Sequence, residues 1–572
     1  MSISRRVLLL CGLLLVCFAF PAQSQDAVPT FIPPTPIPYN TTADSESILS
    51  ESAVARIIAN NRVRIGVLYT EPSFGQFTNR GEVQGYDADL ARAIAETWGV
   101  DLRLRQVTRQ TAFEMLASDE VDILVAAMVH RRDWDDNLEF SQTYYQSAEA
   151  VMVRADDGAQ SLGDFNGRKL GVVLGSPSEA ALREWAARSG FNGTIETFVT
   201  YDRMYGALGS SGVDGIVAPR HRLKQLAAFE PESKRVIDDP IEILPYAIAM
   251  QRQDAPLRGL VNRTLQYLQS EGKLDELRRT HFTDERAESV PIWANLGDDA
   301  PKPANFASTI TYPNTYVIPR LQSGGVLRVA GPWLTSEQFT TATESEKRLD
   351  RFQRDFITAL TRRWNVTLEL ISAAPAEAVR LVNEGGADLA FGIPPDWQYA
   401  DRVDFAAPYL IHGLRLMVKS NSNIFSFEEL RGGLTVETTF NEPDSNAAAI
   451  REATRVNALI DSFQTTESSL ALQLLEDHNA DVAFADSLKL LPHIEAYPND
   501  LKLTDTWYSR EYDALAVPLN DVDFRLLVEY SLQELVRDGT LRQLWNGVVP
   551  VGDQPKLDIY PGSREFLGYV LG

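Results

Sequence analysis

The chain has 572 residues, of which 44% are hydrophobic and 23% are charged, and its formal net charge is −24 at pH 7. A chain of this length and apolar content can bury several cores, and typical domain sizes predict roughly three to four compact bodies. The negative charge repels phosphate groups, which excludes nucleic acid and anionic lipid as general partners.

The first 24 residues have the three parts of an export signal: Arg5-Arg6, an apolar run over Val7–Phe20, and the small-x-small site Ala22-Gln-Ser24. We expect cleavage before Gln25 and an exported protein, periplasmic or at the extracellular surface. The alternative is an uncleaved anchor helix, but the run is shorter than the roughly 20 residues that a bilayer requires. Both cysteines of the chain lie inside the run, so the mature protein is expected to have no disulfide and no thiolate metal site.

Residues 25–50 are rich in Pro, Thr and Ser and poor in periodic apolar positions, so they predict an extended tether. Ordered structure is expected from Ser52, with a short helix followed by an alternating strand at Val63–Val67. The stretch Gly85–Leu104 then predicts a turn, an amphipathic helix and a strand, because its apolar residues recur first at helical and then at alternating spacing.

Strands and helices alternate from there to Phe282, which is typical of parallel sheets with crossover helices. The predicted helices are 111–117, 178–189, 201–208, 256–270 and a short one from Leu274, and the predicted strands are 121–126, 150–153, 169–174, 194–198, 213–217 and 246–250. Residues 285–322 contain five prolines with little periodicity, so they predict an inter-module linker.

The same order of motifs then repeats. Arg351–Leu370 corresponds to the stretch at Gly85–Leu104, and further equivalent positions are Val63 and Leu327, Phe140 and Phe405, Asp214 and Asp481, and Gly272 and Gly539. The shift stays between 264 and 267 residues, which indicates duplication of a complete unit rather than a short repeat. The predicted domains are a first module at 51–284 (lobe a 51–153 and 246–284, lobe b 154–245), the linker, a second module at 323–550, and a C-terminal tail at 551–572.

Several of these motifs carry a resemblance to a known family, the family 3 solute-binding proteins of polar amino-acid ABC transporters. They are Gly85-Tyr-Asp-Ala-Asp-Leu, Leu138-Glu-Phe-Ser-Gln-Thr-Tyr-Tyr, Leu162-Gly-Asp-Phe-Asn-Gly, Tyr246-Ala-Ile-Ala-Met, Val403-Asp-Phe-Ala-Ala-Pro-Tyr and Asp481-Val-Ala-Phe-Ala-Asp486. The resemblance implies an α/β fold with tandem type-2 periplasmic-binding-protein (Venus-flytrap) modules, four α/β lobes in all. It also implies that a ligand is held in the cleft between two lobes.

Burial of a zwitterionic amino acid requires donors for its carboxylate and an acid for its ammonium group. The arginine that the family uses for the carboxylate has Trp134 and Tyr399 at its positions in the two modules. Arg131 is the nearby alternative in the first module, either as a cleft residue or as a solvated loop charge. The family's acid for the ammonium group corresponds to Pro219 in the first module and to Asp486 in the second.

The helix start at Ser176 and Ser178 is a candidate anion site, since backbone N–H groups there can hold a carboxylate, and an ordinary N-cap is the alternative. Phe74 lies where the family places a side chain that stacks on the ligand. Trp134, Trp397 and Trp333 are further candidate walls of the clefts, with local packing as the alternative. In the second module the opening glycine and first acid are replaced by Arg351 and Gln353.

Motifs of enzymes are missing from the sequence: its six histidines are scattered, and no nucleotide-binding, nucleophile-elbow or zinc-protease pattern occurs. We therefore predict a binding protein that is not an enzyme, with no catalytic residue, cofactor or metal. The expected partners are a small polar or zwitterionic solute and an ABC permease or membrane receptor. A sensor or scaffold without a transport role is the alternative, and a cyclohexadienyl-dehydratase-like enzyme is a less favoured one.

Overall fold

The computed structural model describes residues 50–282, 290–430, 434–439, 443–458, 460–475, 480–546, 548–550 and 553–562. Its contacts divide the chain into two compact units. The described part of the first unit comprises Ala150–Pro219 and Leu226–Ile241, and that of the second comprises residues from 50 to Glu149, Arg220–Gln225 and Glu242 onward.

Sheet A organises the start of the second unit and has the strand order β5-β1-β6-β14-β7. Its strands are β1 (Arg62–Leu68), β5 (Asp101–Val107), β6 (Ile123–Leu124), β7 (Leu138–Phe140) and β14 (Ala249–Gln251). The first three are parallel, whereas β14 runs antiparallel to β6 and β7. A small sheet of β2 (Thr70–Glu71), β3 (Gly75–Phe77) and β4 (Val83–Gln84) follows β1.

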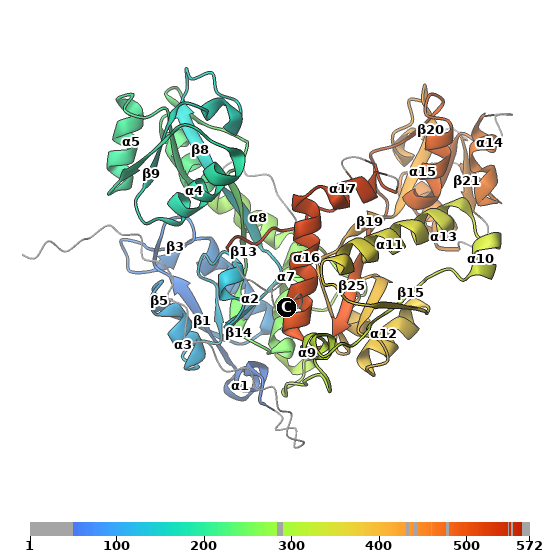
Figure 1. Ribbon diagram of the computed structural model, residues 1–572, viewed down its shortest axis with the longest axis horizontal. Coiled ribbons are helices and arrows are strands. Elements are labelled where there is room, and N and C mark those ends of the chain that lie inside the picture. The colour runs from blue at the N-terminus through green and yellow to red at the C-terminus, as the bar shows by residue number, and fades with distance from the viewer. Residues whose placement is uncertain are drawn as a thin grey trace, which may run out of the picture. The chain divides into compact units, whose positions relative to one another are not determined.

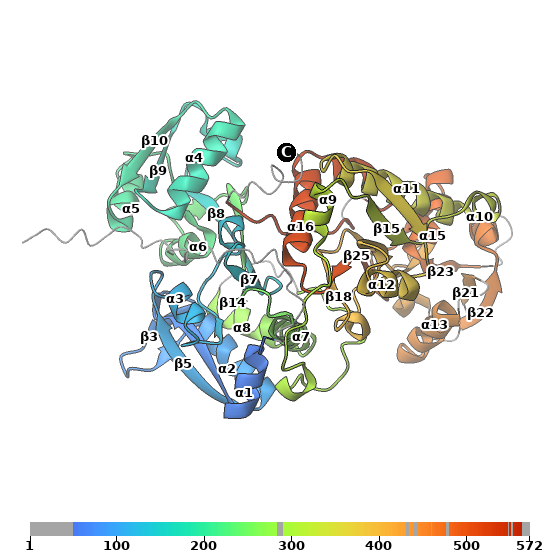
Figure 2. The ribbon, with the colours of Figure 1, turned by 60° about the horizontal axis from the view of Figure 1, so that its bottom comes forward.

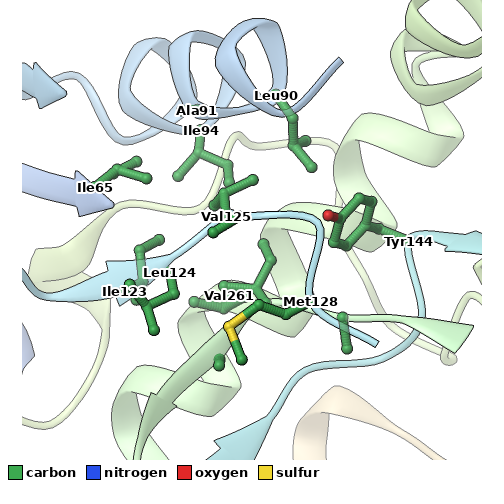
Figure 3. Packing of buried hydrophobic residues seen from close by; sticks show 14 of the residues in the cluster. Ile65, Leu90, Ala91, Ile94, Ile123, Leu124, Val125, Met128, Tyr144 and Val261 are labelled. Carbon is green, nitrogen blue, oxygen red and sulfur yellow. The ribbon is translucent and has the colours of Figure 1, made fainter. Parts of the chain in front are cut away.

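The helices that belong with sheet A are α1 (Ala53–Asn60), α2 (Tyr86–Trp98), α3 (Ala112–Ala117), α7 (Ala255–Ser270) and α8 (Lys273–His281). The apolar face of α2 packs on the sheet, where Leu90 and Ile94 face Ile65 and Val125 (Figure 3). The helix begins after Gly85, whose φ of 133° and close approach to Phe74 leave no room for a Cβ atom, and it ends at the left-handed Gly99. The predicted turn, helix and strand over Gly85–Leu104 are thus confirmed.

Sheet B forms the core of the first unit and has the order β10-β9-β11-β8-β12. Its strands are β8 (Tyr145–Arg154), β9 (Lys169–Val173), β10 (Thr194–Phe198), β11 (Gly215–Pro219) and β12 (Lys234–Val236), accompanied by α4 (Pro177–Ser189), α5 (Tyr201–Gly209) and α6 (Arg220–Phe229). The first residues of β8 belong to the second unit and pair antiparallel with β13 (Glu242–Tyr246).

The second module repeats both sheets. Sheet C has the order β16-β15-β17-β25-β18 and sheet D the order β22-β21-β23-β20-β24, which match sheets A and B strand for strand. Sheet C consists of β15 (Leu327–Gly331), β16 (Leu368–Ser372), β17 (Leu389–Ile393), β18 (Val403–Phe405) and β25 (Glu511–Pro518), with β19 (Leu410–His412) also paired to β25. Sheet D consists of β20 (Leu414–Lys419), β21 (Leu434–Thr439), β22 (Ile460–Thr465), β23 (Val482–Asp486) and β24 (Leu501–Leu503).

The helices of the second module also follow the first. Those beside sheet C are α9 (Val317–Gln322), α10 (Ser336–Thr341), α11 (Glu344–Arg362), α12 (Pro375–Asn383), α16 (Val522–Arg537) and α17 (Thr540–Trp545), and those beside sheet D are α13 (Pro443–Arg455), α14 (Leu470–Leu475) and α15 (Ser487–Ala496). Figure 1 shows α12 beside β15, and Figure 2 shows α13 next to β21, β22 and β23. The predicted fold class, tandem modules of α/β lobes, is confirmed.

Two stretches differ from the elements that the sequence predicted. Within the predicted linker, the described residues 290–322 contain a short 3-10 helix at Pro303–Asn305 and the helix α9, which occupies in the second module the position of α1 in the first. Helix α11 begins at Glu344, well before the position of Gly85, because Arg351 replaces that glycine and Thr343 caps the longer helix in a capping box with Glu346. Among the described residues, no helix is long and apolar enough to cross a bilayer.

Candidate functional site

A partly buried cluster of charges surrounds Glu71, which lies in the loop region after β1 of the first module. Glu71 accepts a hydrogen bond of 2.8 Å from the guanidinium of Arg109, and the guanidinium of Arg222, in the first turn of α6, lies 3.4 Å from its other oxygen. Burial favours the protonated acid, but the two arginines outweigh it and lower the pKa of Glu71. An ionised carboxylate and two guanidinium groups therefore share one site.

Phe74 lies three residues further along the same loop and is 1% exposed. Its ring stacks on Tyr246 at 5.0 Å between centroids and meets Tyr145, His221 and Phe282 edge-on at 5.2 to 5.5 Å. Burial lowers the pKa of His221 to about 4, so its imidazole is neutral at pH 7. The aromatic cluster is thus uncharged and directly adjoins the charged cluster at Glu71.

Asp87, at the start of α2, is linked to the aromatic cluster through Tyr144, the residue before Tyr145. Its carboxylate accepts hydrogen bonds from the backbone N–H of Ala127 at 2.5 Å and from the hydroxyl of Tyr144 at 2.8 Å. Ala127 has a φ of +47°, an unfavourable backbone conformation for alanine, which the bond to Asp87 stabilises. Burial raises the pKa of Asp87 to about 7. Through Tyr144, the acid fixes the start of β8 and so the neighbouring ring of Tyr145.

Arg131 and Trp134 lie together in the loop before β7. The guanidinium of Arg131 forms an ion pair of 2.9 Å with Asp133 and lies 6.0 Å from the centre of the Trp134 ring. That ring meets Phe113 edge-on at 5.4 Å. The structure therefore gives both residues local partners, and their proposed role as cleft residues stays a prediction.

Ser176 and Ser178 lie in the first unit, at the start of α4. Ser176 is the N-cap, and its hydroxyl accepts a hydrogen bond of 3.2 Å from the backbone N–H of Glu179. The Glu179 carboxylate in turn accepts the N–H of Gly175 at 2.7 Å, which lowers its pKa. The N-cap alternative is therefore present, with an anionic side chain of the helix itself on one of the N–H groups.

In the second module, Asp486 already has a cationic partner. Its carboxylate lies 2.7 Å from Nδ1 of His412 and also accepts the backbone N–H of Leu488 at 2.8 Å, which caps α15. Burial alone would lower the pKa of His412, but hydrogen bonds to Asp486 and Asp513 outweigh it and raise that pKa well above 6.5. An imidazolium thus lies beside Asp486, and the role of Asp486 in holding a ligand ammonium group stays a prediction.

The long helix α11 connects the two halves of the second module. Glu467, which follows β22 of sheet D, accepts hydrogen bonds from Ser345 and Thr343 at the start of α11. Arg348, one turn further, forms an ion pair of 2.9 Å with Glu495 of α15. These contacts hold the sheet D half of the module to the sheet C half.

The aromatic candidates of the second module lie in three different surroundings. Trp333 is 3% exposed and faces the core, where it donates to the backbone oxygen of Val329 and meets Phe391 at 5.3 Å. Trp397 donates to the side-chain oxygen of Gln266 in the first module. Tyr399 is half-buried, with Arg402 5.0 Å above its ring. The structure does not bring these residues together with Asp486, and their role in ligand binding stays a prediction.

The two modules contact each other through equivalent residues. Arg258 of α7 pairs with Asp404 of β18, and Arg525 of α16 pairs with Glu139 of β7; both pairs are buried. Gln266 accepts from the indole N–H of Trp397, and Gln533, its counterpart in α16, accepts from Arg132. Such reciprocity is the geometry of a two-fold dimer interface, here formed within one chain.

The segments that follow each module complete this interface. Trp293, after the first module, packs on Trp397 at 4.7 Å, and its N–H donates to Gln266. Tyr560, after the second module, stacks on His130 at 3.7 Å, and its N–H donates to Gln533. We call the described residues 553–562 the C-terminal arm. Each segment thus lies against the opposite module.

The charged cluster was missed by sequence reasoning. Glu71 lies in the same loop as Phe74 and was available as a signal, because it is an acid next to a predicted stacking residue. Arg109 and Arg222 lie 38 and 151 residues from Glu71 and had no motif to mark them.

Both modules are similar to known proteins. The family model described as bacterial extracellular solute-binding proteins, family 3, matches residues 63–284 and 335–547. The ABC transporter glutamine-binding protein GlnH of Bacillus subtilis (strain 168) is 26% identical over 254 residues, which make up 44% of this chain and 90% of that protein. The arginine-binding extracellular protein ArtP of the same organism is 26% identical over 220 residues, or 37% of this chain and 82% of that one.

Among solved structures, an ancestral arginine-binding protein bound to arginine is 26% identical, with a TM-score of 0.33 and coverage of 39% of this chain and 99% of that chain. The first matched region covers sheets A and B, apart from Arg62 of β1, and the second covers sheet D and the strands of sheet C except β15, which precedes it. Since these regions make up most of the sequence, the protein belongs to the family 3 bacterial extracellular solute-binding proteins and carries two copies of the module in tandem.

Proposed function

We propose that the first module binds a small polar or zwitterionic, amino-acid-like solute outside the cytoplasm, for delivery to an ABC permease. The observation that carries this proposal is the cluster of Glu71, Arg109 and Arg222 beside the ring of Phe74. It supplies, from other positions, the acid and the arginines that the family pattern lacks in this module.

The chemistry of the cluster suits a zwitterion. A guanidinium group binds a carboxylate through two parallel hydrogen bonds, and a carboxylate binds an ammonium group. A ligand carboxylate on Arg109 or Arg222 and its ammonium group on Glu71 would give each ligand charge a partner of opposite sign, so neither ligand charge would be buried unpaired. Phe74 and its aromatic neighbours would cover the apolar part of the ligand.

The relatives and the strand pairing support the rest of the proposal. Relatives with about a quarter of their residues identical are described as glutamine-binding and arginine-binding proteins, the former of an ABC transporter. Strands β8 and β13, which pair antiparallel, are the two crossing strands of the first module. We infer that they serve as a hinge and that closure around the solute forms the state recognised by the permease.

The second module favours a different role. Its halves are tied by the contacts of Glu467 and Arg348 with opposite elements, and Asp486 is neutralised by His412. We propose that this module acts as a scaffold for the first. If the first module also fails to bind solutes, the whole chain would be a scaffold or sensor without a transport role.

Isothermal titration calorimetry with the twenty amino acids and common polyamines tests solute binding. At 100 times its dissociation constant, a true ligand should also stabilise the protein by about 2.7 kcal/mol. Glu71→Gln and Arg109→Gln should each weaken binding at least tenfold, because each leaves a ligand charge unpaired. Arg105→Gln is the matched control, since Arg105 lies in β5, four residues before Arg109, and forms a solvent-exposed ion pair with Glu120.

A chain that binds none of these compounds would contradict the proposal, as would a ligand whose affinity is the same in Glu71→Gln. The transport step needs a separate measurement, uptake of the radiolabelled ligand by cells of the source organism with and without the gene. Unchanged uptake together with intact binding would favour the sensor or scaffold role.

A further inference from the structure

A cavity of about 370 Å³ lies between the two modules, inside the second compact unit. This volume falls within the range of natural small-molecule sites, roughly 300–1,000 Å³. The charged residues Glu71, Arg109 and Arg222 do not line this cavity, although Tyr145, which packs on Phe74, lies in its wall. It is lined by residues of both modules and of the C-terminal arm, among them Phe140, Gln142, Phe405, Ile411, Arg525 and Gln554.

Two donor atoms in the wall of this cavity have no acceptor among the described residues. They are Nε of Arg525 and Nε2 of Gln554, both buried. Arg525 itself is only 5% exposed, and its two terminal nitrogens pair with Glu139 and Glu529. Because a buried donor without an acceptor is destabilising, a guest that brings acceptor oxygens would satisfy what the two atoms lack.

The other residues that line the cavity indicate which kind of ligand it can bind. Arg510 and Lys556 add cationic groups, and Phe140, Trp293, Phe405 and Leu557 add apolar and aromatic surface. Two carboxylates also line the cavity: Glu529 pairs with Arg525, and Asp558 accepts hydrogen bonds from Thr143 and Gln146. The charges of Arg258 and Arg525 are already matched by Asp404 and Glu139, so the cavity has room for one small anionic group rather than for several. A carboxylate on a compact apolar body satisfies both parts of the wall.

We propose that this inter-module cavity is a second binding site, which takes the carboxylate of a small organic acid. Gln554 and Arg525 donate to the carboxylate, and the aromatic rings hold the apolar body. The wall includes Gln146 at the start of β8 and Ile411 in β19, so a bound acid would contact the crossing strands of both modules.

Calorimetry on the full exported chain tests the site, with benzoate, succinate and inorganic phosphate as probes. We expect benzoate or succinate to bind with one site per chain and phosphate to bind at least tenfold more weakly. Gln554→Leu, which removes one donor at similar volume, should weaken carboxylate binding about tenfold. Ala407→Leu, which fills part of the cavity, should have a similar or larger effect.

Two further variants separate this site from others. Gln106→Leu, at an exposed glutamine of β5, should leave carboxylate binding unchanged, and so should Glu71→Gln in the charged cluster of the first module. The proposal is overturned if neither carboxylate binds, if phosphate binds as tightly as both, or if binding survives Gln554→Leu and Ala407→Leu unchanged. Loss of binding in Glu71→Gln would assign the carboxylate to the first module instead.

Discussion

The guanidinium of Arg258 donates to the carboxylate of Asp404 across the module boundary, and the reverse pair, Arg525 with Glu139, does the same in the opposite direction. Arg258 and Arg525 occupy equivalent positions of the duplicated sequence, as do Glu139 and Asp404. In an isologous dimer each contact occurs twice, with the roles of the two subunits exchanged, and these two pairs are related in the same way by exchange of the two modules. We infer that the modules associate as two copies of one protein would, now joined by a linker.

Arg258→Met should destabilise the protein by about 3–5 kcal/mol, because it leaves the buried carboxylate of Asp404 without its charge partner. Denaturant unfolding, followed by tryptophan fluorescence, measures the change. Arg380→Met is the matched control: Arg380 pairs with Glu377 on an exposed surface of α12, and its loss there should change stability little. Equal effects of the two variants would contradict a buried pair at the module boundary.

Tyr560→Ala should loosen the C-terminal arm from the first module, because it removes the ring that stacks on His130. The loss of buried aromatic surface predicts a destabilisation of about 1.5–3 kcal/mol. Asp558 of the same arm accepts hydrogen bonds from Thr143 and Gln146, so hydrogen exchange at the start of β8 should accelerate in the variant. Phe229→Ala, at a ring that is 83% exposed, should change neither quantity.

The buried carboxyl group of Asp87 should make the protein less stable as the pH rises from about 4 to about 7. Burial raises the pKa of Asp87 from 3.8 to about 7 in the folded protein, so over this range the native state keeps a proton that the unfolded chain has released. The free energy of unfolding should therefore fall across the range, by at most about 4 kcal/mol. In Asp87→Asn this part of the pH dependence should vanish; an unchanged pH profile would contradict the prediction.

The protonated imidazole of His412 should give the stability of the protein a second dependence on pH, above pH 6.5. Hydrogen bonds to Asp486 and Asp513 overcome the effect of burial and raise the pKa of His412 well above 6.5. The stabilisation by this imidazolium is complete below pH 6.5 and is lost as the pH rises through the raised pKa. His412→Gln should lower stability at pH 6 and should flatten the profile above pH 6.5, as measured by thermal unfolding. A variant as stable as the parent at pH 6 would show that the ion pair contributes nothing.

The sequence by itself determined the scaffold of both modules. The periodicity over Gly85–Leu104 predicted α2 and β5, and the nearly constant shift of the later motifs predicted that sheets A and B would recur as C and D. These features depend on local spacing of apolar residues, which a linear sequence displays directly. Spacing did not predict where a cap changed a boundary, as at Thr343, which starts α11 earlier than Gly85 starts α2, nor the helix α9 in the region expected to be a linker.

The tertiary structure alone decided which side chains share a site. Glu71 meets Arg222 from 151 residues away, and Arg132 meets Gln533 from 401 residues away. Asp486, which the resemblance placed beside a ligand, is hydrogen-bonded to His412, 74 residues distant in the chain. Partners of this kind are selected by burial and charge pairing once the sheets have packed, because an ion needs a counterion only after water has been excluded. No local pattern encodes that choice.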